Sequence, residues 1–359
     1  MKKIYLLIIA ALTFVTAANA QSSSNNSGGF DQLIKSSPGD ATKLVQAYAE
    51  PLFKGFGVGL NSGWNNTAAT KKFLHIDLRI TANVAQVPMI DQTFDVTKIG
   101  LSSHITPDAT SPTNIAQTFG GDKNAANPIL DIRDDNGNKL SSFTMPKAII
   151  GYIPAPNVQL TIGLFKNTDV TVRTTPTIDL GDAGSVSIFG FGIKHDLIQD
   201  FAKKGKVKPF DLAIAVNYNR INYTKTLSVQ PDAGTSPATG TPGDFSNQRI
   251  TGTFSGTNVQ AIISKKLSFF TPFASVGYQT SNTDFGAFGN YPVTSSVPGQ
   301  GNKYVVITDP VHITESGTVS GMRGDVGFQL NLLILRICAS YGISGGGYNS
   351  ANVGVGLGF

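Results

Sequence analysis

Three ionisable side chains, His75, Asp77 and Arg79, alternate with apolar residues in one stretch of the sequence. Such a column could bind an ion or tune a pore, because charged rings set the selectivity of channels. Arg323 and Asp325 repeat the pattern near the carboxy terminus. The simpler interpretation is a hydrated wall of paired charges, since the interiors of membrane barrels are ordinarily polar. Both interpretations require extended strands that form a barrel, with these five candidates on the side that faces its interior.

Catalytic chemistry has little support in the sequence. A hydrolase needs a nucleophile, a histidine and an orienting acid within hydrogen-bond reach. The four histidines, His75, His104, His195 and His312, are scattered, and one cysteine, Cys338, adds no metal-ligand spacing. No glycine-rich nucleotide loop leads from a strand into a helix. We therefore expect no enzyme, no metal and no cofactor.

The elements that would position the charged residues are strands. From Leu74 to Val84 every second residue is apolar and those between are mostly polar, a period of two that predicts a strand. Several such segments are longer than strands of soluble sheets and suit a tilted membrane crossing. With one or two further strands between 85 and 150, we predict an all-β transmembrane antiparallel barrel of about 14 strands (range 12–16). The other segments considered are 55–61, 94–101, 148–153, 158–165, 169–175, 185–194, 207–226, 258–265, 269–280, 304–308, 322–332, 337–343 and 353–359.

The amino terminus has the features of a secretory signal peptide. Lys2 and Lys3 precede a short apolar run, and Ala18-Asn19-Ala20 provides an A-x-A site, so we predict cleavage after Ala20. Cleavage would reduce the formal charge from +5 to +3, too little to suggest nucleic-acid binding. Charged residues make up only 14% of the chain, against about a quarter in typical soluble domains. These properties indicate an exported β protein.

Residues 21–51 form a polar leader followed by one short amphipathic helix. Ser37-Pro38-Gly39-Asp40 resembles a helix start, and Pro51 is expected to end the helix. The barrel would then occupy 52–359. Tight connections alternate with long polar ones, an asymmetry typical of barrels with short periplasmic turns and long outer loops. The long connections are 102–146, 228–247 and 281–317, and a brief helix is expected at 196–204.

Glycines recur at every second position in two segments that we expect to be the first and last strands. Paired at the closing seam, they would leave a groove of bare backbone on the lumen side. That groove could receive the amino-terminal helix or a hydrophobic ligand. Alternatively, the small residues only ease curvature at closure. The glycines are Gly55, Gly57, Gly59, Gly354, Gly356 and Gly358.

The carboxy-terminal strand ends in Phe359 after a clean apolar alternation, and this ending resembles the assembly signal of Gram-negative outer-membrane barrels. The order of the pieces is similar to the fatty-acid-transporter-like barrels, and the run 190–197 (GFGIKHDL) resembles an element of an uncharacterised outer-membrane family. The transporters' asparagine-proline-alanine plug motif is absent, because Asn127-Pro128 precedes Ile129. The resemblance implies a location in the outer membrane of a Gram-negative bacterium, contact with its lipid and with the barrel-assembly machinery, and a partly plugged lumen.

Three functional hypotheses follow. The first is a channel or transporter for small molecules, including hydrophobic ones. The second is a non-transport anchoring or interaction protein that acts through the long outer loops. The third, a secreted soluble sandwich, requires the apolar rows of two sheets to face each other.

Overall fold

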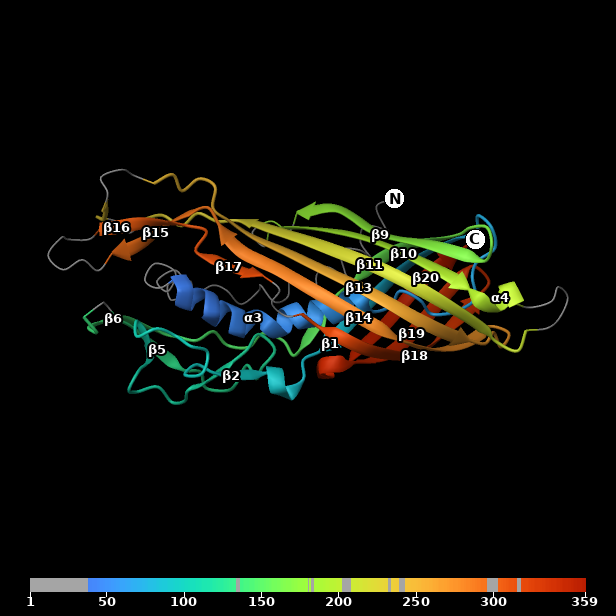
Figure 1. Cartoon of the computed structure of the whole chain (residues 1–359), viewed down its shortest axis with the longest axis horizontal. Coiled ribbons are helices and arrows are strands. Elements are labelled where there is room, and N and C mark those ends of the chain that lie inside the picture. The colour runs from blue at the N-terminus through green and yellow to red at the C-terminus, as the bar shows by residue number, and fades with distance from the viewer. Residues whose placement is uncertain are drawn as a thin grey trace.

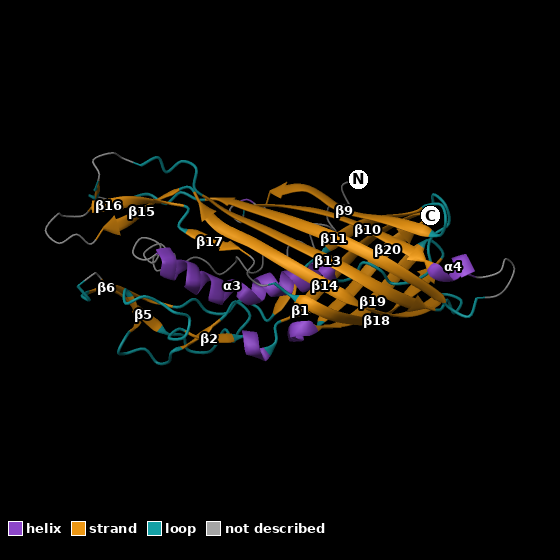
Figure 2. Cartoon of the chain, viewed as in Figure 1, coloured by secondary structure: helices purple, strands orange, loops and turns teal. Residues whose placement is uncertain are grey.

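The computed structural model describes residues 38–359 except 134–135, 180, 182–183, 202–207, 232–233, 239–242, 296–302 and 315–317. The signal peptide, its cleavage site, the polar leader and the Ser37 helix cap lie outside the described residues. Ten long strands form an antiparallel barrel (Figures 1 and 2). They are β1 (Ile76–Gln86), β8 (Asn157–Gly163), β9 (Thr168–Asp179), β10 (Ser185–Asp196), β11 (Asp211–Thr226), β13 (Arg249–Ser264), β14 (Phe270–Phe288), β18 (Ser320–Leu332), β19 (Leu335–Ser344) and β20 (Ser350–Gly358).

The barrel is closed by two sets of pairings. Around the wall the strands follow the order β13-β11-β10-β9-β8-β1-β20-β19-β18-β14, and β14 pairs with β13 to complete the circle. The first and last strands, β1 and β20, pair from Asp77 opposite Gly358 to Ala85 opposite Ser350. The all-β barrel class is confirmed, but 14 strands was wrong. The segments at 55–61, 94–101, 148–153 and 304–308 do not contribute long barrel strands. Residues 55–61 are helical, and the other three segments overlap only short strands at the loop-bearing end.

The alternation of side chains divides each strand between two environments. In β1, Asp77, Arg79, Thr81 and Asn83 are buried inside, whereas the apolar residues between them face outward. Because strands in hydrocarbon must have no unpaired edge, a closed barrel with an apolar outer band and a polar interior indicates an outer-membrane protein. The strands enclose one lumen, so the soluble sandwich is excluded. Exposed outer-wall residues include Leu78, Ile80, Leu160, Phe191, Ile193, Ile214, Val216, Tyr218, Val259, Val276, Tyr278, Met322, Val326, Tyr341, Ile343, Val353 and Val355.

No helix among the described residues is both long enough and apolar enough to cross a membrane.

One long helix, α3 (Pro38–Asn61), enters the barrel from the end that carries the long loops (Figure 1). It contacts β1, β7, β11, β13, β14 and β17. The expected helix end at Pro51 was wrong, because Pro51 lies inside the helix. The expected strand at 55–61 is its last part, so the barrel wall begins at Ile76 instead of residue 52. Helical residues surrounded by protein on all sides lose the one-sided apolar pattern that identifies surface helices.

The long loops fold against the outer half of α3. Ala41, Leu44 and Phe53 of the helix form an apolar core with Leu130 and Ile132 of the loop between β1 and β8, and with the outer ends of β13, β14 and β17. The long connection at 102–146 is part of this loop, and it lies at the outer end and contains short strands. The outer elements are η1 (Met89–Asp91), β2 (Thr93–Asp95), β3 (Ile105–Pro107), β4 (Ile115–Gln117), β5 (Ile129–Arg133), β6 (Lys139–Thr144), β7 (Tyr152–Pro154), β12 (Ser236–Pro237), β15 (Asn290–Ser295), β16 (Lys303–Thr308), β17 (Val311–Thr314) and η3 (Gly345–Gly347).

The opposite end of the barrel carries tight turns, the carboxy terminus and the short helix α4 (Leu197–Phe201) (Figure 1). The predicted helix at 196–204 is confirmed from Leu197 to Phe201, whereas Asp196 is the last residue of β10 and residues 202–204 lie outside the described range. Short turns face the periplasm in barrels of this type. We therefore call this the inner end and the loop-bearing end the outer end.

Candidate functional site in the barrel lumen

Three arginines from three strands converge in the lumen, and we call Arg79, Arg173 and Arg323 the arginine collar. Each is almost completely buried. Arg323 forms a salt bridge with Asp325 at 2.6 Å. Within the described part of the chain, Arg79 and Arg173 have no carboxylate at salt-bridge distance. A buried charge is costly unless other groups interact with it. The groups that accept hydrogen bonds from Arg79 and Arg173 therefore indicate what the site can do.

Those partners are carbonyl oxygens of the chain that fills the lumen, residues 38–75, which we call the plug. The Arg173 guanidinium donates to the Leu60 carbonyl at 2.9 Å and to the Ser62 carbonyl at 3.0 Å. Arg79 donates to the Trp64 carbonyl at 2.8 Å. The collar therefore recognises backbone oxygens at and just beyond the end of α3, where the helix dipole favours cations.

The carbonyl oxygens at the end of α3 all find hydrogen-bond donors inside the lumen. The last four carbonyls of a helix have no partner inside it, and here each accepts a hydrogen bond. The donors are the Ser62 hydroxyl for Val58 (2.7 Å), the Ser62 amide for Gly59 (3.1 Å), Arg173 and Asn219 for Leu60 (2.9 and 2.8 Å), and Asn258 for Asn61 (3.0 Å). Ser62 of the plug and three wall side chains thus replace the water that would otherwise hydrate this helix end.

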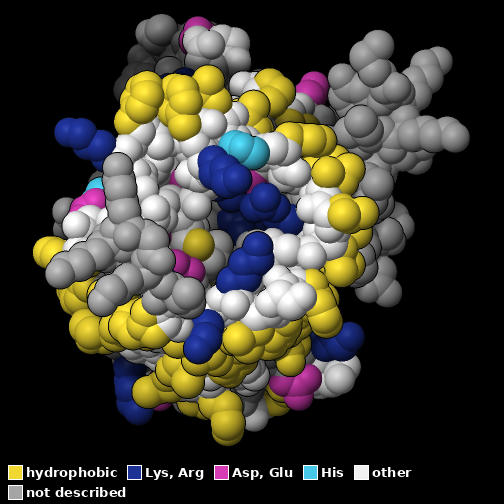
Figure 3. All heavy atoms as spheres, turned by 90° about the vertical axis from the view of Figure 1, so that its right-hand side faces the viewer, with side chains coloured by type: hydrophobic (Ala, Val, Ile, Leu, Met, Phe, Trp, Pro, Cys, Tyr) yellow, Lys and Arg dark blue, Asp and Glu magenta, His cyan; other side chains and the backbone are white. Residues whose placement is uncertain are grey.

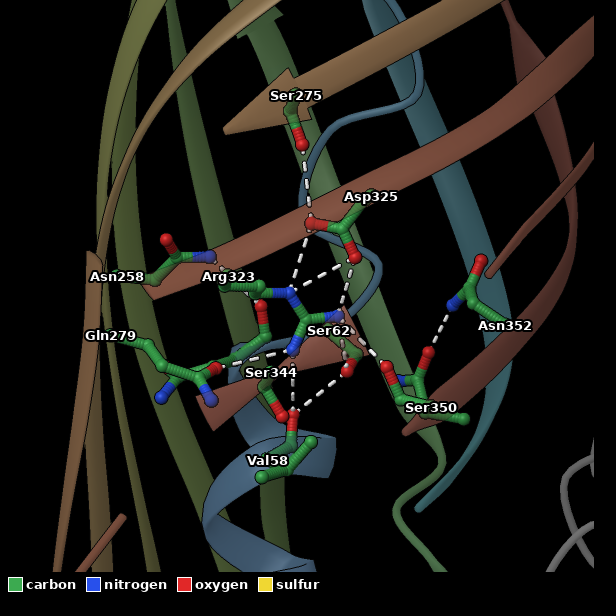
Figure 4. A network of polar contacts seen from close by, with 12 residues as sticks. Val58, Ser62, Asn258, Ser275, Gln279, Arg323, Asp325, Ser344, Ser350 and Asn352 are labelled. Atoms are coloured by element: carbon green, nitrogen blue, oxygen red, sulfur yellow. Dashed lines mark hydrogen bonds and ion pairs between the residues drawn. The ribbon is translucent and has the colours of Figure 1, made fainter. Parts of the chain in front are cut away.

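Arg323 connects the helix to two sides of the wall (Figure 4). Its guanidinium donates to the Ser62 and Ser350 hydroxyls, both at 2.9 Å, and to the Val58 carbonyl at 3.4 Å. Asp325 accepts from the Ser275 hydroxyl at 3.1 Å. The Arg323–Asp325 pair therefore belongs to a network that spans plug and wall.

Trp64, the single tryptophan of the chain, lies in the plug just beyond α3. The Arg173 guanidinium carbon is 3.8 Å from the centre of its ring, a cation–π contact. A Cβ atom on Gly192 would lie 3.0 Å from the ring. Gly192 belongs to the GFGIKHDL run, so a glycine of this run makes room for the plug.

Towards the inner end, the lumen holds alternating charges. The Lys71 amine lies 3.4 Å from Asp77, and Arg336 lies 2.9 Å from the same carboxylate. Lys194 forms a salt bridge with Asp169 at 3.1 Å. Burial lowers the pKa of Lys71 to about 8, although Asp77 opposes this effect. Figure 3 shows the basic side chains gathered in a hollow at the middle of the inner end, surrounded by hydrophobic ones.

One small apolar contact accompanies these polar ones. Ala68 of the plug packs on Ala213, Ala215, Ile262 and Phe273 of the wall. Thr67 lies beside it, and its hydroxyl is 3.1 Å from the Ser264 hydroxyl.

Four of the five charged candidates lie in the lumen: Asp77, Arg79, Arg323 and Asp325. His75 does not, because β1 begins one residue later and His75 is exposed at the inner rim. The sequence interpretation did not select Arg173, although it lies on the polar row of its strand. Its partners in the plug are more than 100 residues away in the sequence, 113 in the case of Leu60 and 111 in the case of Ser62.

The two glycine rows do not pair with each other. Gly55, Gly57 and Gly59 are helical, and added Cβ atoms would collide with Ile153, Ser281 and Ala155 respectively. They allow α3 to approach the wall closely. Gly354, Gly356 and Gly358 face the lumen in β20, but they make room for Thr81, Arg79 and Arg336 of neighbouring strands. The seam groove is therefore filled by wall side chains, and the predicted contact with the helix at this groove was wrong.

Phe359 lies at the inner end of the seam. Its backbone exchanges two hydrogen bonds with Ile76, at 2.9 and 3.0 Å, while the ring is largely exposed. The terminal residue thus completes the pairing of first and last strands. Its role as an assembly signal stays a prediction.

Two arrangements resemble catalytic ones. His195 contacts Thr168 at 3.0 Å and Asp200 at 2.8 Å, but the Thr168 hydroxyl also lies 3.0 Å from the Lys166 carbonyl, which accepts its hydrogen. Residues 342–346 (GISGG) match the G-x-S-x-G pattern, which the sequence interpretation overlooked. Ser344 ends a strand there and donates to the Tyr348 carbonyl at 2.5 Å. Among the described residues, no group of three or more His, Cys, Asp or Glu could hold a metal ion.

Comparison with solved structures finds other outer-membrane barrels. OmpT, the outer membrane protease of Escherichia coli, matches with a TM-score of 0.30 and 8% identity, covering 83% of this chain and 100% of OmpT. Ail of Yersinia pestis gives 0.26 and 9%, covering 80% and 98%. A FadL homologue of Pseudomonas aeruginosa gives 0.22 and 12%, covering 84% and 95%.

No curated protein matches the sequence. A family model matches residues 1–359, the whole sequence, and the chain belongs to that family, a family of unknown function designated DUF6588.

Proposed function

We propose that this member of the DUF6588 family is a plugged outer-membrane transporter for small anionic solutes. The observation that carries the proposal is the arginine collar, in which two of the three buried arginines donate hydrogen bonds to plug carbonyls and, among the described residues, have no carboxylate at salt-bridge distance. If residues 62–75 move aside, Arg79 and Arg173 lose these acceptors. They would then face water in the lumen, where rings of arginine favour anions.

The contacts of the inner plug support movement of this segment. Hydrogen bonds between protein groups can be exchanged for hydrogen bonds to water at a net cost of only about 1 kcal/mol each. Apart from Ala68, the described contacts between residues 62–70 and the wall are mostly polar, whereas Val58 and Leu60 of the helix lie in apolar clusters. The outer half of α3 is instead part of an apolar core and cannot be exposed so cheaply. We therefore assign the moving part to the inner plug segment and the fixed part to the helix.

The substrate class follows from the charge of the path. The collar and the basic hollow at the inner end would attract an anion and repel a cation. The hydrophobic ligand considered for the glycine groove fits this lumen less well, because the lumen wall presents charged and amide side chains.

A reversible cross-link tests the proposal. Thr67→Cys and Ser264→Cys together would join plug and wall at hydroxyls that are 3.1 Å apart. In proteoliposomes, we expect the reduced double variant and the wild type to admit small anions in preference to cations. Oxidation should abolish uptake and a thiol reductant should restore it.

The single variants Thr67→Cys and Ser264→Cys are the matched controls and should not respond to oxidation. Uptake that is unchanged by the cross-link, or equal for anions and cations, contradicts the proposal. The double variant Arg79→Ala/Arg173→Ala lacks the hydrogen bonds from these arginines to the plug carbonyls. The absence of uptake in both the wild type and this variant also contradicts the proposal.

The second candidate is an interaction protein that acts at the outer end. It is favoured by exposed apolar residues on the folded outer loops, including Leu140, Ile149 and Ile150. Changing these three to serine should then abolish cross-linking to a specific envelope protein while anion uptake stays intact. Loss of uptake without loss of a partner would favour the transporter.

A further inference from the structure

A pocket of about 410 Å³ opens at the inner rim, separate from the arginine collar. It lies between the end of the plug and the turn that connects β8 to β9, and this volume suits a small-molecule group. A Cβ atom on Gly163 would collide with the Lys72 carbonyl, so this glycine lets the plug cross the end of β8. The lining residues are Thr70, Lys71, Lys72, Phe73, Leu164, Phe165, Lys166, Asn167 and Gln199.

Three lysines give the pocket a positive charge. Lys71 is partly neutralised by Asp77, 3.4 Å away. Lys72 and Lys166 are exposed, and neither has a salt-bridge partner within the described ranges. The amide nitrogens of Gln199 and Asn167 already donate within the protein, to Thr70 and Asp196 and to Asp200 respectively. The primary amines and the Thr70 hydroxyl are the donors the pocket offers, and amines of this kind bind phosphate groups.

The other side of the pocket is apolar and continues onto the lipid-facing wall. The rings of Phe73 and Phe165 stack with centres 4.1 Å apart. Phe165 is 70% exposed and Phe73 47%. Leu74 and Leu164 are also exposed beside them. Aromatic side chains at this height mark the boundary between hydrocarbon and headgroups.

We propose that this pocket binds the phosphate of a phospholipid from the inner leaflet of the outer membrane. The lysines would bind the phosphate while Phe73 and Phe165 contact the first carbons of the acyl chains. The location at the short-turn end commits the site to the inner leaflet. This inference does not depend on transport.

Lipid binding to the full mature protein in detergent micelles tests the proposal, with phosphatidylglycerol as the probe and native mass spectrometry as the readout. We expect one retained lipid per barrel. Each lysine near a membrane surface contributes about fivefold in affinity. Lys72→Gln/Lys166→Gln should therefore weaken binding about 25-fold.

A second turn at the inner end provides a matched control. Lys265 and Lys266 also adjoin exposed apolar residues, Leu267 and Phe269, but none of these lines the pocket. Lys265→Gln/Lys266→Gln should leave the affinity within about twofold. Equal losses in both double variants, or no loss in Lys72→Gln/Lys166→Gln, overturn the proposal.

Free phosphate compounds distinguish a lipid site from a site for soluble phosphates. Millimolar sn-glycerol 3-phosphate should fail to displace the lipid, and Phe165→Ser should weaken lipid binding although every lysine remains. Displacement by glycerol 3-phosphate, with Phe165→Ser equal to wild type, overturns the lipid proposal in favour of a soluble ligand. Heat-dependent mobility on a denaturing gel checks that each variant barrel is folded.

Discussion

The outer and inner halves of the plug are held by different forces. Between Ala41 and Phe56, helix α3 contributes to an apolar core with the outer loops. Between Ser62 and Thr70, beyond the end of the helix, the plug is held mainly by hydrogen bonds with arginine, lysine and serine side chains of the wall. Apolar area costs about 25 cal/mol per Å² to expose, whereas polar groups can find new partners in water. The comparison teaches that one continuous segment can be anchored at one end and exchangeable at the other.

Truncation of the apolar half should have the largest effect. Phe53 is fully buried, and its ring contacts Phe254 and Phe285. Phe53→Ala should destabilise the outer core by about 3–5 kcal/mol through the cavity it leaves. Limited proteolysis should then cleave the 87–150 loop faster. Fluorescence of Trp64 should not change, and a change would show that the two halves are coupled.

Removal of a collar arginine should loosen only the inner half. Arg173→Gln loses charge-assisted hydrogen bonds to Leu60 and Ser62 and the contact with Trp64, a loss of about 2–3 kcal/mol. The emission of Trp64, the single tryptophan, should shift to longer wavelength and become more accessible to acrylamide. Arg220→Gln, an exposed arginine on β11, is the control. Unchanged quenching in Arg173→Gln would mean that the collar does not hold the plug.

The buried lysine of the inner half gives a pH dependence of known sign. Burial lowers the pKa of Lys71 to about 8 from an unfolded value of 10.5, so the unfolded chain binds more protons between these values and stability rises with pH there. From pH 7 to 9.5 the wild type should gain about 2 kcal/mol relative to Lys71→Met. Urea unfolding in vesicles measures this difference. A difference that stays constant with pH would contradict the burial of a charged amine.

The smallest effect is expected where helix and wall touch at a glycine. A Cβ atom on Gly57 would collide with the Ser281 side chain. Gly57→Ala should cost about 1 kcal/mol, because the collision outweighs the better helix propensity of alanine. Ser281→Gly should relieve it in a double-mutant cycle. Additive effects of the two changes would show that the helix does not approach β14 this closely.

The barrel strands were predictable because each has two contrasting faces. In the stretch 76–84 the lipid-facing row and the lumen-facing row differ at every position, so a local pattern is sufficient. The end of α3, in contrast, was not predictable from its local pattern. Gly55, Gly57 and Gly59 alternate as in a strand, and nothing local indicates that the helix will be enclosed on all sides. The count of 14 was too high partly for this reason.

The site was predictable only in part. Arg79, Arg323 and their carboxylate neighbours follow from strand alternation. Arg173 lies on such a row as well, but its meeting with Leu60 and Trp64 depends on tertiary packing. The single tryptophan directly after the glycine-rich helix was the one signal in the sequence that could have drawn attention to this segment. His75 was misplaced because the strand begins at Ile76, two residues later than the alternation suggests.

The seam between β1 and β20 has a consequence for biogenesis. The helix precedes the first wall strand in the chain, and the final strand is the last to be made. Since Gly356 lies directly opposite Arg79, the pairing of β1 with β20 also positions the Arg79 guanidinium, which holds the plug. We expect α3 to be seated before β1 and β20 pair, so that this helix acts as the form around which the wall is wrapped.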